Sequence, residues 1–133
     1  MKKNNKPDNV NKKWLYFAEE DYNLIIYLWN KDNKFYRSIC FHSQQYVEKV
    51  LKGILEGNSA SVPRIHDINA LVKRVEKFGI KVPLTEEQIL FLSSVYIDTR
   101  YPPDVGLLPN GEPQKKDAAI AVKAVKKIKE WLD

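Results

Sequence analysis

Cysteine and histidine are scarce in this sequence of 133 residues, which contains one cysteine and two histidines. A single cysteine cannot form an intrachain disulfide bridge, and the lack of a cysteine pair predicts a reducing, cytoplasmic environment. So few cysteine and histidine side chains do not suffice for a zinc site without carboxylates, and we expect no metal site. The sequence also lacks a glycine-rich phosphate loop and a nucleophile elbow. These absences favour a binding module over an independent enzyme, and we expect no cofactor.

Long apolar runs are absent as well. The first 13 residues are basic, but the acidic residues 19–21 follow before any long uncharged apolar stretch, so we expect neither a signal peptide nor a membrane span. A chain of this length suits one domain, in which roughly two-thirds of the unfolded surface can be buried. We predict a disordered basic tail at residues 1–10 and a single domain at residues 11–133.

The formal net charge of +5 is unevenly distributed along the chain. Residues 1–13 carry a charge of +4 and residues 114–133 carry +3, whereas the segment between them carries −2. The basic excess therefore lies in the expected tail and on the last helix. This pattern is more typical of a solvated surface than of a groove that follows a phosphate backbone. RNA binding stays open, because the net charge does not establish it.

Apolar residues recur every three or four positions through most of the chain, which is the period of an amphipathic α-helix. Thr85 and Gln88 have the spacing of a capping box at a helix start, and no segment shows the alternation of a strand. We expect five helices at residues 11–29, 35–56, 66–78, 85–100 and 114–132. The first helix is expected to face the core with Trp14, Phe17, Ala18, Ile25 and Leu28. The predicted fold is all-α, an antiparallel up-and-down helical bundle.

The segment 41–53, FHSQQYVEKVLKG, is the most informative part of the chain. Neighbours on a helix lie three and four residues apart. One stripe therefore contains Cys40, Gln44, Val47, Leu51 and Ile54, and an adjacent stripe contains His42, Gln45 and Lys49. The amide of Gln44 needs partners from the protein or a ligand, since an unpaired buried polar group costs roughly 1–3 kcal/mol. On the same stripe, Cys40 is expected to be a buried inert thiol rather than a nucleophile.

Asp21 points toward the apolar side of the first helix, where a carboxylate is costly unless it is paired. Its candidate partners are Arg37, Lys49, Lys52 and Arg100. In one interpretation, the ion pair locks the bundle. In the other, Asp21 orients a lysine or arginine that meets a phosphate or a nucleotide.

Lys49 is the better candidate for binding, because it lies on the polar stripe with the histidine and the second glutamine. In the alternative interpretation, Lys49 and Lys52 form an ordinary solvated face with Glu48 and Glu56. Pairs of Lys52 with Glu48 and Glu56 would each stabilise the helix there by a few tenths of a kcal/mol. We interpret His66 as a helix cap or a hydrogen-bonded structural residue, since one histidine without partners is poor evidence for catalysis.

These segments together resemble the signature of the HEPN superfamily, small helical domains named for higher eukaryotes, prokaryotes and nucleotide binding. In chain order the matching pieces are Asp21 after Trp14 and Ala18, the segment FHSQQYVEKVLKG, the pair His66-Asp67, and the triplet Arg100-Tyr101-Pro102. They span residues 14–103, and the last expected helix is compatible with the family. The resemblance implies an all-α bundle of HEPN type but does not by itself fix the function.

The resemblance implies a nucleotide- or RNA-associated binding module that acts with a separately encoded minimal nucleotidyltransferase, as in toxin–antitoxin pairs. The residues implied to bind the nucleotide or the partner are Asp21, Gln44, Gln45, Lys49, Arg100 and Tyr101. Family members commonly associate, so we expect a homodimer, with aromatic surface at Trp29, Phe35 and Tyr36. A purely structural, dimeric helical interaction domain is an alternative.

A second alternative is a metal-independent endoribonuclease toxin. Active members of the superfamily carry an arginine, a short spacer and a histidine, and two copies meet across a dimer cleft. The histidine can activate a 2′-hydroxyl and the arginine can stabilise the phosphate in the transition state. The candidate catalytic residues are Arg37, His42 and Arg100. Arg37 and His42 point about 140° apart on a helix, and no histidine follows Arg100 within the spacer, so enzymatic activity stays open.

Overall fold

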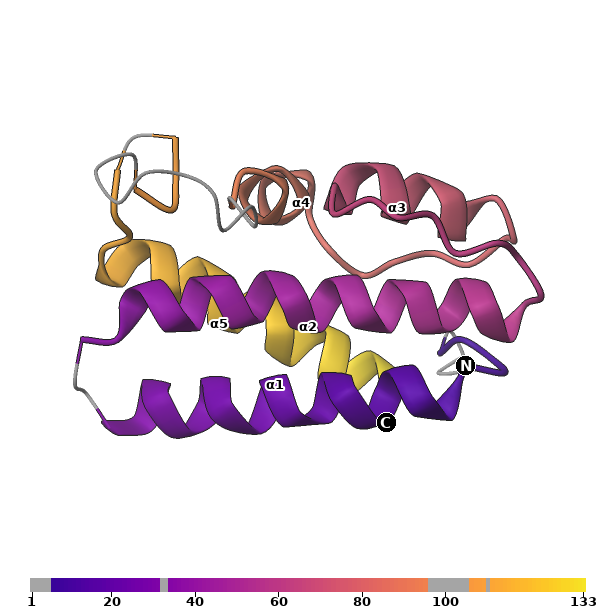
Figure 1. Ribbon diagram of the computed structural model, residues 1–133, viewed down its shortest axis with the longest axis horizontal. Helices are drawn as coiled ribbons and strands as arrows, with labels where there is room; N and C mark the ends of the chain where they lie inside the picture. The colour runs from indigo at the N-terminus through magenta and orange to yellow at the C-terminus, as the bar shows by residue number, and fades with distance from the viewer. Residues whose placement is uncertain (1–5, 32–33, 96–105, 110) are drawn as a thin grey trace.

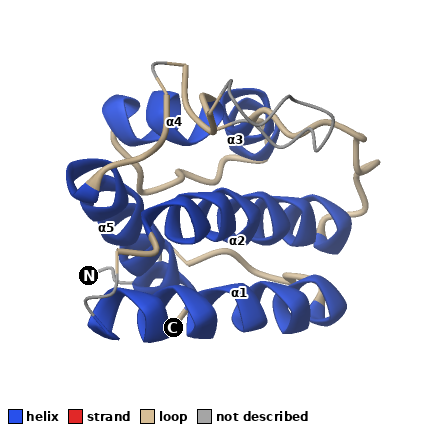
Figure 2. Ribbon diagram, turned by 60° about the vertical axis from the view of Figure 1, so that its left-hand side comes forward, coloured by secondary structure: helices blue, strands red, loops and turns tan. Residues whose placement is uncertain are grey.

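The computed structural model describes residues 6–31, 34–95, 106–109 and 111–133, and its elements are α-helices joined by loops (Figure 1). The helices are α1 (Lys12–Lys31), α2 (Tyr36–Gly57), α3 (Ile68–Glu76), α4 (Glu86–Ser93) and α5 (Lys115–Leu132). Within these described ranges, the β-type pairing is limited to an isolated bridge between Leu108 and Gly111, and Figure 2 draws the described chain as helices and loops. The prediction of an all-α helical bundle is confirmed.

The second helix, α2, is the centre of the bundle and contacts each of the other four helices. Figure 1 shows α1 and α2 side by side and antiparallel, with α5 passing obliquely behind them. Helices α3 and α4 lie on the side of α2 that is remote from α1, and Figure 2 shows the same order from another direction. A polar side chain on α2 can therefore be enclosed either against α1 or beneath the α3 side of the molecule.

Local sequence accounts for several helix ends. The Thr85 hydroxyl accepts a hydrogen bond from the backbone N–H of Gln88, whose side chain accepts one from the backbone N–H of Thr85, so the predicted capping box is present. Asp67 caps α3 by accepting hydrogen bonds from two backbone N–H groups of its first turn. At Gly57, the last residue of α2, an added Cβ would lie 1.4 Å from the backbone oxygen of Asn9. Glycine, which has no Cβ, is what allows the N-terminal segment to cross this helix end so closely.

The predicted apolar stripe of α2 forms the middle of the core. Its five members are fully buried: Cys40, Gln44, Val47, Leu51 and Ile54. The residues of the adjacent stripe are only partly buried, as the helical spacing predicts. The core continues on α3 and α5 through Leu71, Val75, Ala121, Val125 and Ile128. The periodic pattern thus identified both the helix and the face of it that is covered.

Some sequence-based expectations differ from the structure. Phe17 is exposed rather than inward, because the buried face of α1 is centred on Ala18 and Ile25 and adjacent helical positions point about 100° apart. Helices α3 and α4 are shorter than predicted, and residues 96–100, at the end of the predicted fourth helix, lie outside the described residues.

The aromatic residues expected to face a second copy are not equally accessible. Trp29 and Tyr36 are partly buried against the core, whereas Phe35 is exposed. None of the described helices is both long and apolar enough to cross a membrane.

Candidate functional site

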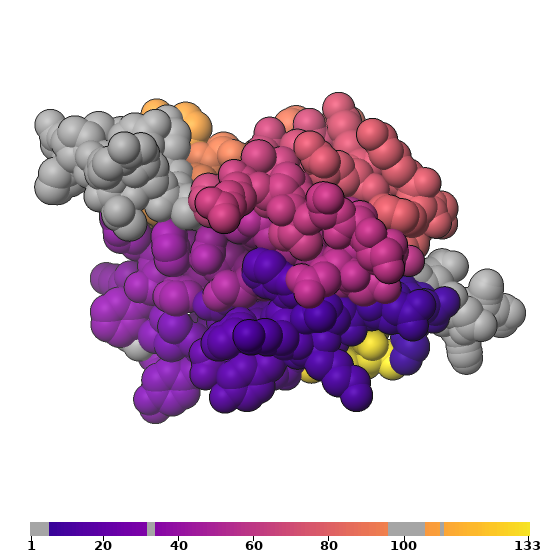
Figure 3. All heavy atoms as spheres, turned by 45° about the vertical axis from the view of Figure 1, so that its right-hand side comes forward, coloured from indigo at the N-terminus to yellow at the C-terminus, as the bar shows by residue number. Residues whose placement is uncertain are grey.

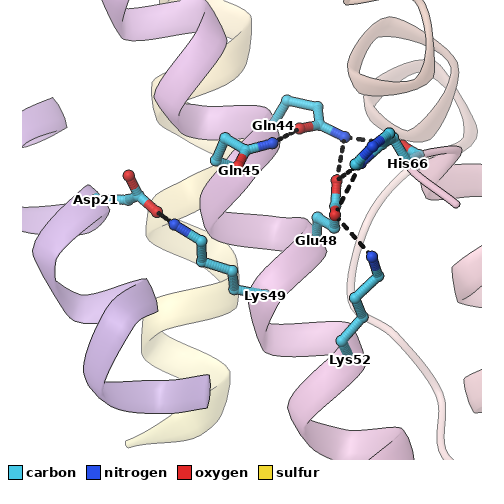
Figure 4. Close-up of polar contacts among 7 residues, drawn as sticks. All are labelled: Asp21, Gln44, Gln45, Glu48, Lys49, Lys52 and His66. Atoms are coloured by element: carbon cyan, nitrogen blue, oxygen red, sulfur yellow. Dashed lines mark hydrogen bonds and ion pairs between the residues drawn. The ribbon is translucent and has the colours of Figure 1, made fainter. Parts of the chain in front are cut away.

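Asp21 on α1 contacts two basic side chains of α2. Its Oδ1 lies 2.8 Å from His42 Nδ1, and its Oδ2 accepts a hydrogen bond of 2.6 Å from Lys49 Nζ. Figure 4 shows the Asp21–Lys49 pair in the space between the two helices. Of the four partners considered for Asp21 from the sequence, the structure pairs it with Lys49. The contact with His42 was missed, although His42 and Lys49 are seven residues apart on one face of a helix, a spacing that could have suggested a shared partner.

Burial and pairing shift the pKa of the Asp21 carboxyl in opposite directions. Burial alone would raise the pKa of its carboxyl, but the hydrogen bonds and charges of His42 and Lys49 outweigh it and hold this pKa below the ordinary value. Asp21 is nearly buried, whereas the side chains of His42 and Lys49 are 30% and 27% exposed. An anion approaching from solvent would therefore meet the histidine and the lysine before the carboxylate.

A line of amide hydrogen bonds crosses α2 beside this cluster. The Gln45 amide donates to Gln44 Oε1 at 2.8 Å. The Gln44 amide nitrogen donates to the backbone oxygen of His66 at 2.8 Å and to Glu48 Oε1 at 3.1 Å (Figure 4). The protein itself therefore supplies the partners that a buried amide at position 44 was predicted to need.

Glu48, Lys52 and His66 form a second ionic cluster on the α3 side of α2. Glu48 accepts a hydrogen bond of 2.8 Å from Lys52 Nζ, and His66 Nδ1 lies 3.0 Å from both of its carboxylate oxygens. Glu48 and Lys52 are buried, with 6% of each residue exposed. The expectation that Glu48 and Lys52 belong to a solvated face is therefore wrong. The signal was available, because Glu48 follows the buried Gln44 by four residues and so lies on the same side of the helix.

His66 contributes to this cluster through both its ring and its backbone. The ring is hydrogen-bonded to Glu48, and the backbone oxygen accepts from Gln44, so its assignment as a hydrogen-bonded structural residue is consistent with the geometry. The cap of α3 is the next residue, Asp67.

The structure gives Arg37 and His42 different partners. Arg37 forms an exposed ion pair of 2.6 Å with Glu112, which precedes α5, whereas His42 contacts Asp21. Their side chains are therefore not brought to a common point within one chain. Arg100 and Tyr101, the other candidates near the end of the predicted fourth helix, lie outside the described residues.

Several reactive or polar groups on α2 are enclosed by the core. Burial, and to a lesser extent the charge of Asp117, raises the pKa of the Cys40 thiol to about 12, so the prediction of a buried thiol is confirmed. Burial likewise raises the pKa of Tyr46. The hydroxyls of Ser43 and Tyr46 have no hydrogen-bond partner among the described residues. These groups stay protonated at neutral pH and lie apart from the exposed cations.

The described residues contain no group of three or more His, Cys, Asp or Glu side chains that could hold a metal ion. A hollow of about 390 Å³ lies where α1 begins and α2 ends, and is lined by Asn11, Lys13, Trp14, Phe17 and Glu56. In it, the Trp14 indole N–H donates a hydrogen bond of 2.8 Å to Glu56, so the carboxylate expected to pair with Lys52 joins α2 to α1 instead.

Comparisons with known proteins bear on the family. No curated protein and no solved structure matched this chain. A family model described as "HEPN domain" matches residues 11–133, which is essentially the whole chain. HEPN domains are all-helical, in agreement with the helical bundle described above. As a family, they are related to nucleotides or RNA and commonly dimerise. The chain belongs to the HEPN domain family.

Proposed function

We propose that this protein is a nucleotide- or RNA-binding module that acts with a minimal nucleotidyltransferase, as one half of a toxin–antitoxin pair. The observation that carries the proposal is the cluster of Asp21, His42 and Lys49, in which a nearly buried carboxylate holds two partly exposed basic side chains between α1 and α2. Holding both in place reduces the side-chain entropy that is lost when a phosphate binds.

Charge explains why the cluster suits an anionic ligand. Lys49 supplies a positive charge and His42 a ring nitrogen, and both side chains are more exposed than the carboxylate that holds them. Gln45, on the same stripe of α2, adds an amide that is already oriented by its hydrogen bond to Gln44. We assign the binding of phosphate groups to His42 and Lys49, and the positioning of both to Asp21.

Calorimetric titration with ATP, and separately with a single-stranded RNA oligonucleotide, tests this assignment. The Asp21→Asn/Lys49→Met double variant removes a cation and its counter-charge together, so that no unpaired carboxylate stays in the helix interface. We expect it to bind at least about tenfold more weakly, the effect of losing about 1.4 kcal/mol. The matched control is Lys123→Met, which removes an exposed lysine on α5. Wild-type protein that binds neither probe, or a double variant that binds as well as wild type, contradicts the assignment.

The nucleotidyltransferase partner requires its own experiment. A minimal nucleotidyltransferase encoded beside this gene would be co-expressed with the tagged protein, and we expect the two to co-elute as one complex. The absence of such a neighbouring gene, or the separate elution of the two proteins, would argue against the pairing while leaving the nucleotide titration as an independent test.

One observation favours a second function, that of a metal-independent endoribonuclease. Asp21 contacts His42 through Nδ1, which leaves Nε2 as the ring nitrogen that could exchange a proton with a 2′-hydroxyl. The arrangement of Arg37 argues against it, because its partner is Glu112. Incubation with structured and single-stranded RNA in EDTA tests it, using Arg37→Ala, His42→Ala and Arg100→Ala beside Lys127→Ala as control. We expect no cleavage by the isolated protein; cleavage abolished by His42→Ala but kept by the control would establish the enzyme.

A further inference from the structure

The hollow where α1 begins and α2 ends contains a carboxylate, that of Glu56, with which no lysine or arginine of the described residues pairs. Glu56 is exposed, and none of the ion pairs between described residues includes it. Its Oε1 accepts the Trp14 indole N–H at 2.8 Å, and its Oε2 accepts the Asn11 amide at 3.4 Å. Both donors are uncharged, so they orient the carboxylate without compensating its negative charge.

The two donors are themselves held in place by the fold. The Asn11 side chain caps α1, because its Oδ1 accepts hydrogen bonds from two backbone N–H groups of the first turn. Trp14 is packed closely against α2, since a Cβ added to Gly53 would lie 2.9 Å from the Trp14 Cβ. The hollow is therefore formed before any ligand arrives, which lowers the entropic cost of binding.

Two aromatic side chains of α1, those of Trp14 and Phe17, line the same hollow. Phe17 is 43% exposed, and its ring meets the ring of Tyr16 edge-on, with the centroids 5.3 Å apart. The first half of α1 forms part of the outer surface in Figure 3, so a ligand can reach the hollow from solvent. The faces of aromatic rings attract cations, and those of tryptophan do so most strongly. Aromatic rings beside an uncompensated carboxylate favour an organic cation as the ligand.

We propose that this hollow binds the guanidinium group of an arginine whose own α-carboxylate is free. Each oxygen of Glu56 accepts one hydrogen bond from the protein and keeps a further lone pair. A guanidinium can therefore donate to both oxygens as a fork, the strongest geometry for such a pair. The same planar group stacks on aromatic rings, whereas the ammonium of a lysine is compact and strongly hydrated. The volume of about 390 Å³ lies within the range of small-ligand sites.

Lys13 is the reason why the ligand carries a carboxylate as well. It is exposed and lines the same hollow. Helix α1 begins beside it, at Lys12, and the first turn has no acidic residue to offset the positive end of the helix dipole. A cation without an anion of its own would be repelled by these positive charges. A ligand with both groups satisfies Glu56 through its guanidinium and Lys13 through its carboxylate, and both free arginine and the C-terminal arginine of a peptide have this chemistry.

A guanine base is an alternative occupant, because it is planar, stacks on aromatic side chains and has N–H donors at its edge. It is uncharged, however, and would leave the negative charge of Glu56 uncompensated. The arginine site lies apart from the Asp21 cluster and does not rest on ligand binding there.

Nuclear magnetic resonance of the full chain, titrated with L-arginine, tests the proposal. The Trp14 indole N–H donates to Glu56, so its signal reports on that carboxylate, and Trp14→Phe identifies the signal by removing it. We expect this signal to shift saturably in the millimolar range. Glu56→Gln keeps an acceptor oxygen but removes the charge, and should weaken binding at least about tenfold. The matched control is Glu130→Gln, which changes an exposed carboxylate on α5 and should bind arginine as wild type does.

Agmatine, which has the guanidinium but no carboxylate, tests the role of Lys13. It should bind several-fold more weakly than L-arginine. Lys13→Met should weaken the binding of arginine and strengthen that of agmatine, whereas Lys123→Met, which removes an exposed lysine on α5, should change neither. The tripeptide Gly-Gly-Arg separates the two sources of the ligand. Binding as tight as that of arginine supports a protein C-terminus, and binding of free arginine alone supports a small molecule.

Several results would overturn the proposal. They are a Trp14 indole signal that L-arginine does not shift, a Glu56→Gln variant that binds arginine as tightly as wild type, and agmatine that binds as tightly as arginine. Tighter binding of GMP than of arginine would also overturn it, since the hollow would then belong to a nucleobase. Circular dichroism melts show whether each variant is folded. If Glu56→Gln unfolds, Lys13→Met still decides the question, because it changes an exposed side chain and is expected to shift the two affinities in opposite directions.

Discussion

Replacing Glu48 with glutamine tests the buried ionic cluster on the α3 side of α2. The change preserves the size of the side chain but removes its charge, so Lys52 is left as a cation with 6% of its surface exposed. Removing one partner of a buried ion pair costs about 3–5 kcal/mol, because the remaining charge is uncompensated. The new amide still offers an oxygen to Lys52 or His66, so we expect a loss near the lower end, about 3 kcal/mol.

A loss of this size is large for a domain of 133 residues. Single domains unfold with a free energy of about 5–15 kcal/mol. At this chain length each kcal/mol corresponds to about 4 °C in the melting temperature, so Glu48→Gln should melt about 12 °C below wild type. Urea unfolding followed by far-ultraviolet circular dichroism measures the free energy, and a thermal scan measures the melting temperature.

Two further variants make the result specific to the buried pair. Glu130→Gln, which changes an exposed carboxylate on α5, should stay within about 0.5 kcal/mol of wild type. Glu48→Met/Lys52→Met removes both charges and should be more stable than Glu48→Gln, since no unpaired charge is left in the core. A Glu48→Gln variant within about 1 kcal/mol of wild type would match an exposed pair and refute the reasoning. A double variant less stable than the single one would refute it as well.

Three other predictions concern separate parts of the molecule. The depressed pKa of Asp21 implies stability that is present above its ordinary value of 3.8 and is lost as the pH falls through the lower folded value. The destabilisation caused by Asp21→Asn, measured by urea unfolding, should therefore be largest near neutral pH and shrink in acid. Gly57→Ala should cost at least about 2 kcal/mol, since its Cβ would overlap the Asn9 backbone; removing residues 1–9 should relieve most of this loss, and an equal loss in the shortened chain would contradict the explanation. Cys40, whose pKa is raised to about 12, should react with Ellman's reagent only after unfolding in urea, and rapid labelling of the native protein would show that the thiol is accessible.

The helices could be predicted from the sequence because burial of one helix face requires apolar residues every three or four positions. The α2 stripe from Cys40 to Ile54 alternates in steps of three and four, and all five of its members are buried. The capping box at Thr85 could be predicted equally well, since it depends on two residues that are three positions apart in the sequence. Phe17 was misassigned because it lies next to the true inward position Ala18, and an apolar residue beside the core stripe gives the same local signal whether it faces the core or a second protein.

The polar clusters depend on contacts between distant parts of the chain, which spacing alone does not reveal. Glu48 and Lys52 have the four-residue spacing of a surface pair, and only the segment that carries His66 encloses them. Charge narrowed the expected partners of Asp21 to four lysines and arginines, but selecting Lys49 among them and finding the additional contact with His42 required the relative rotation of α1 and α2. Side-chain packing across two helices sets that rotation, and it has no short-range signature.

The two clusters repeat one chemical unit on opposite sides of α2, and their different exposure separates their roles. In each, a carboxylate is contacted by a histidine Nδ1 and a lysine Nζ: Asp21 with His42 and Lys49, and Glu48 with His66 and Lys52. Lys49 is partly exposed, so its charge can act on a ligand. Lys52 is buried and its charge is paired with that of Glu48. The hydrogen bonds of Gln44 and Gln45 lead to the Glu48 cluster, whereas Asp21 is paired with His42 and Lys49, so each cluster can be changed by its own substitution. The Asp21 cluster is therefore identified as the binding site if Asp21→Asn/Lys49→Met weakens ligand binding, while Glu48→Met/Lys52→Met changes the stability of the protein and leaves its ligand affinity intact.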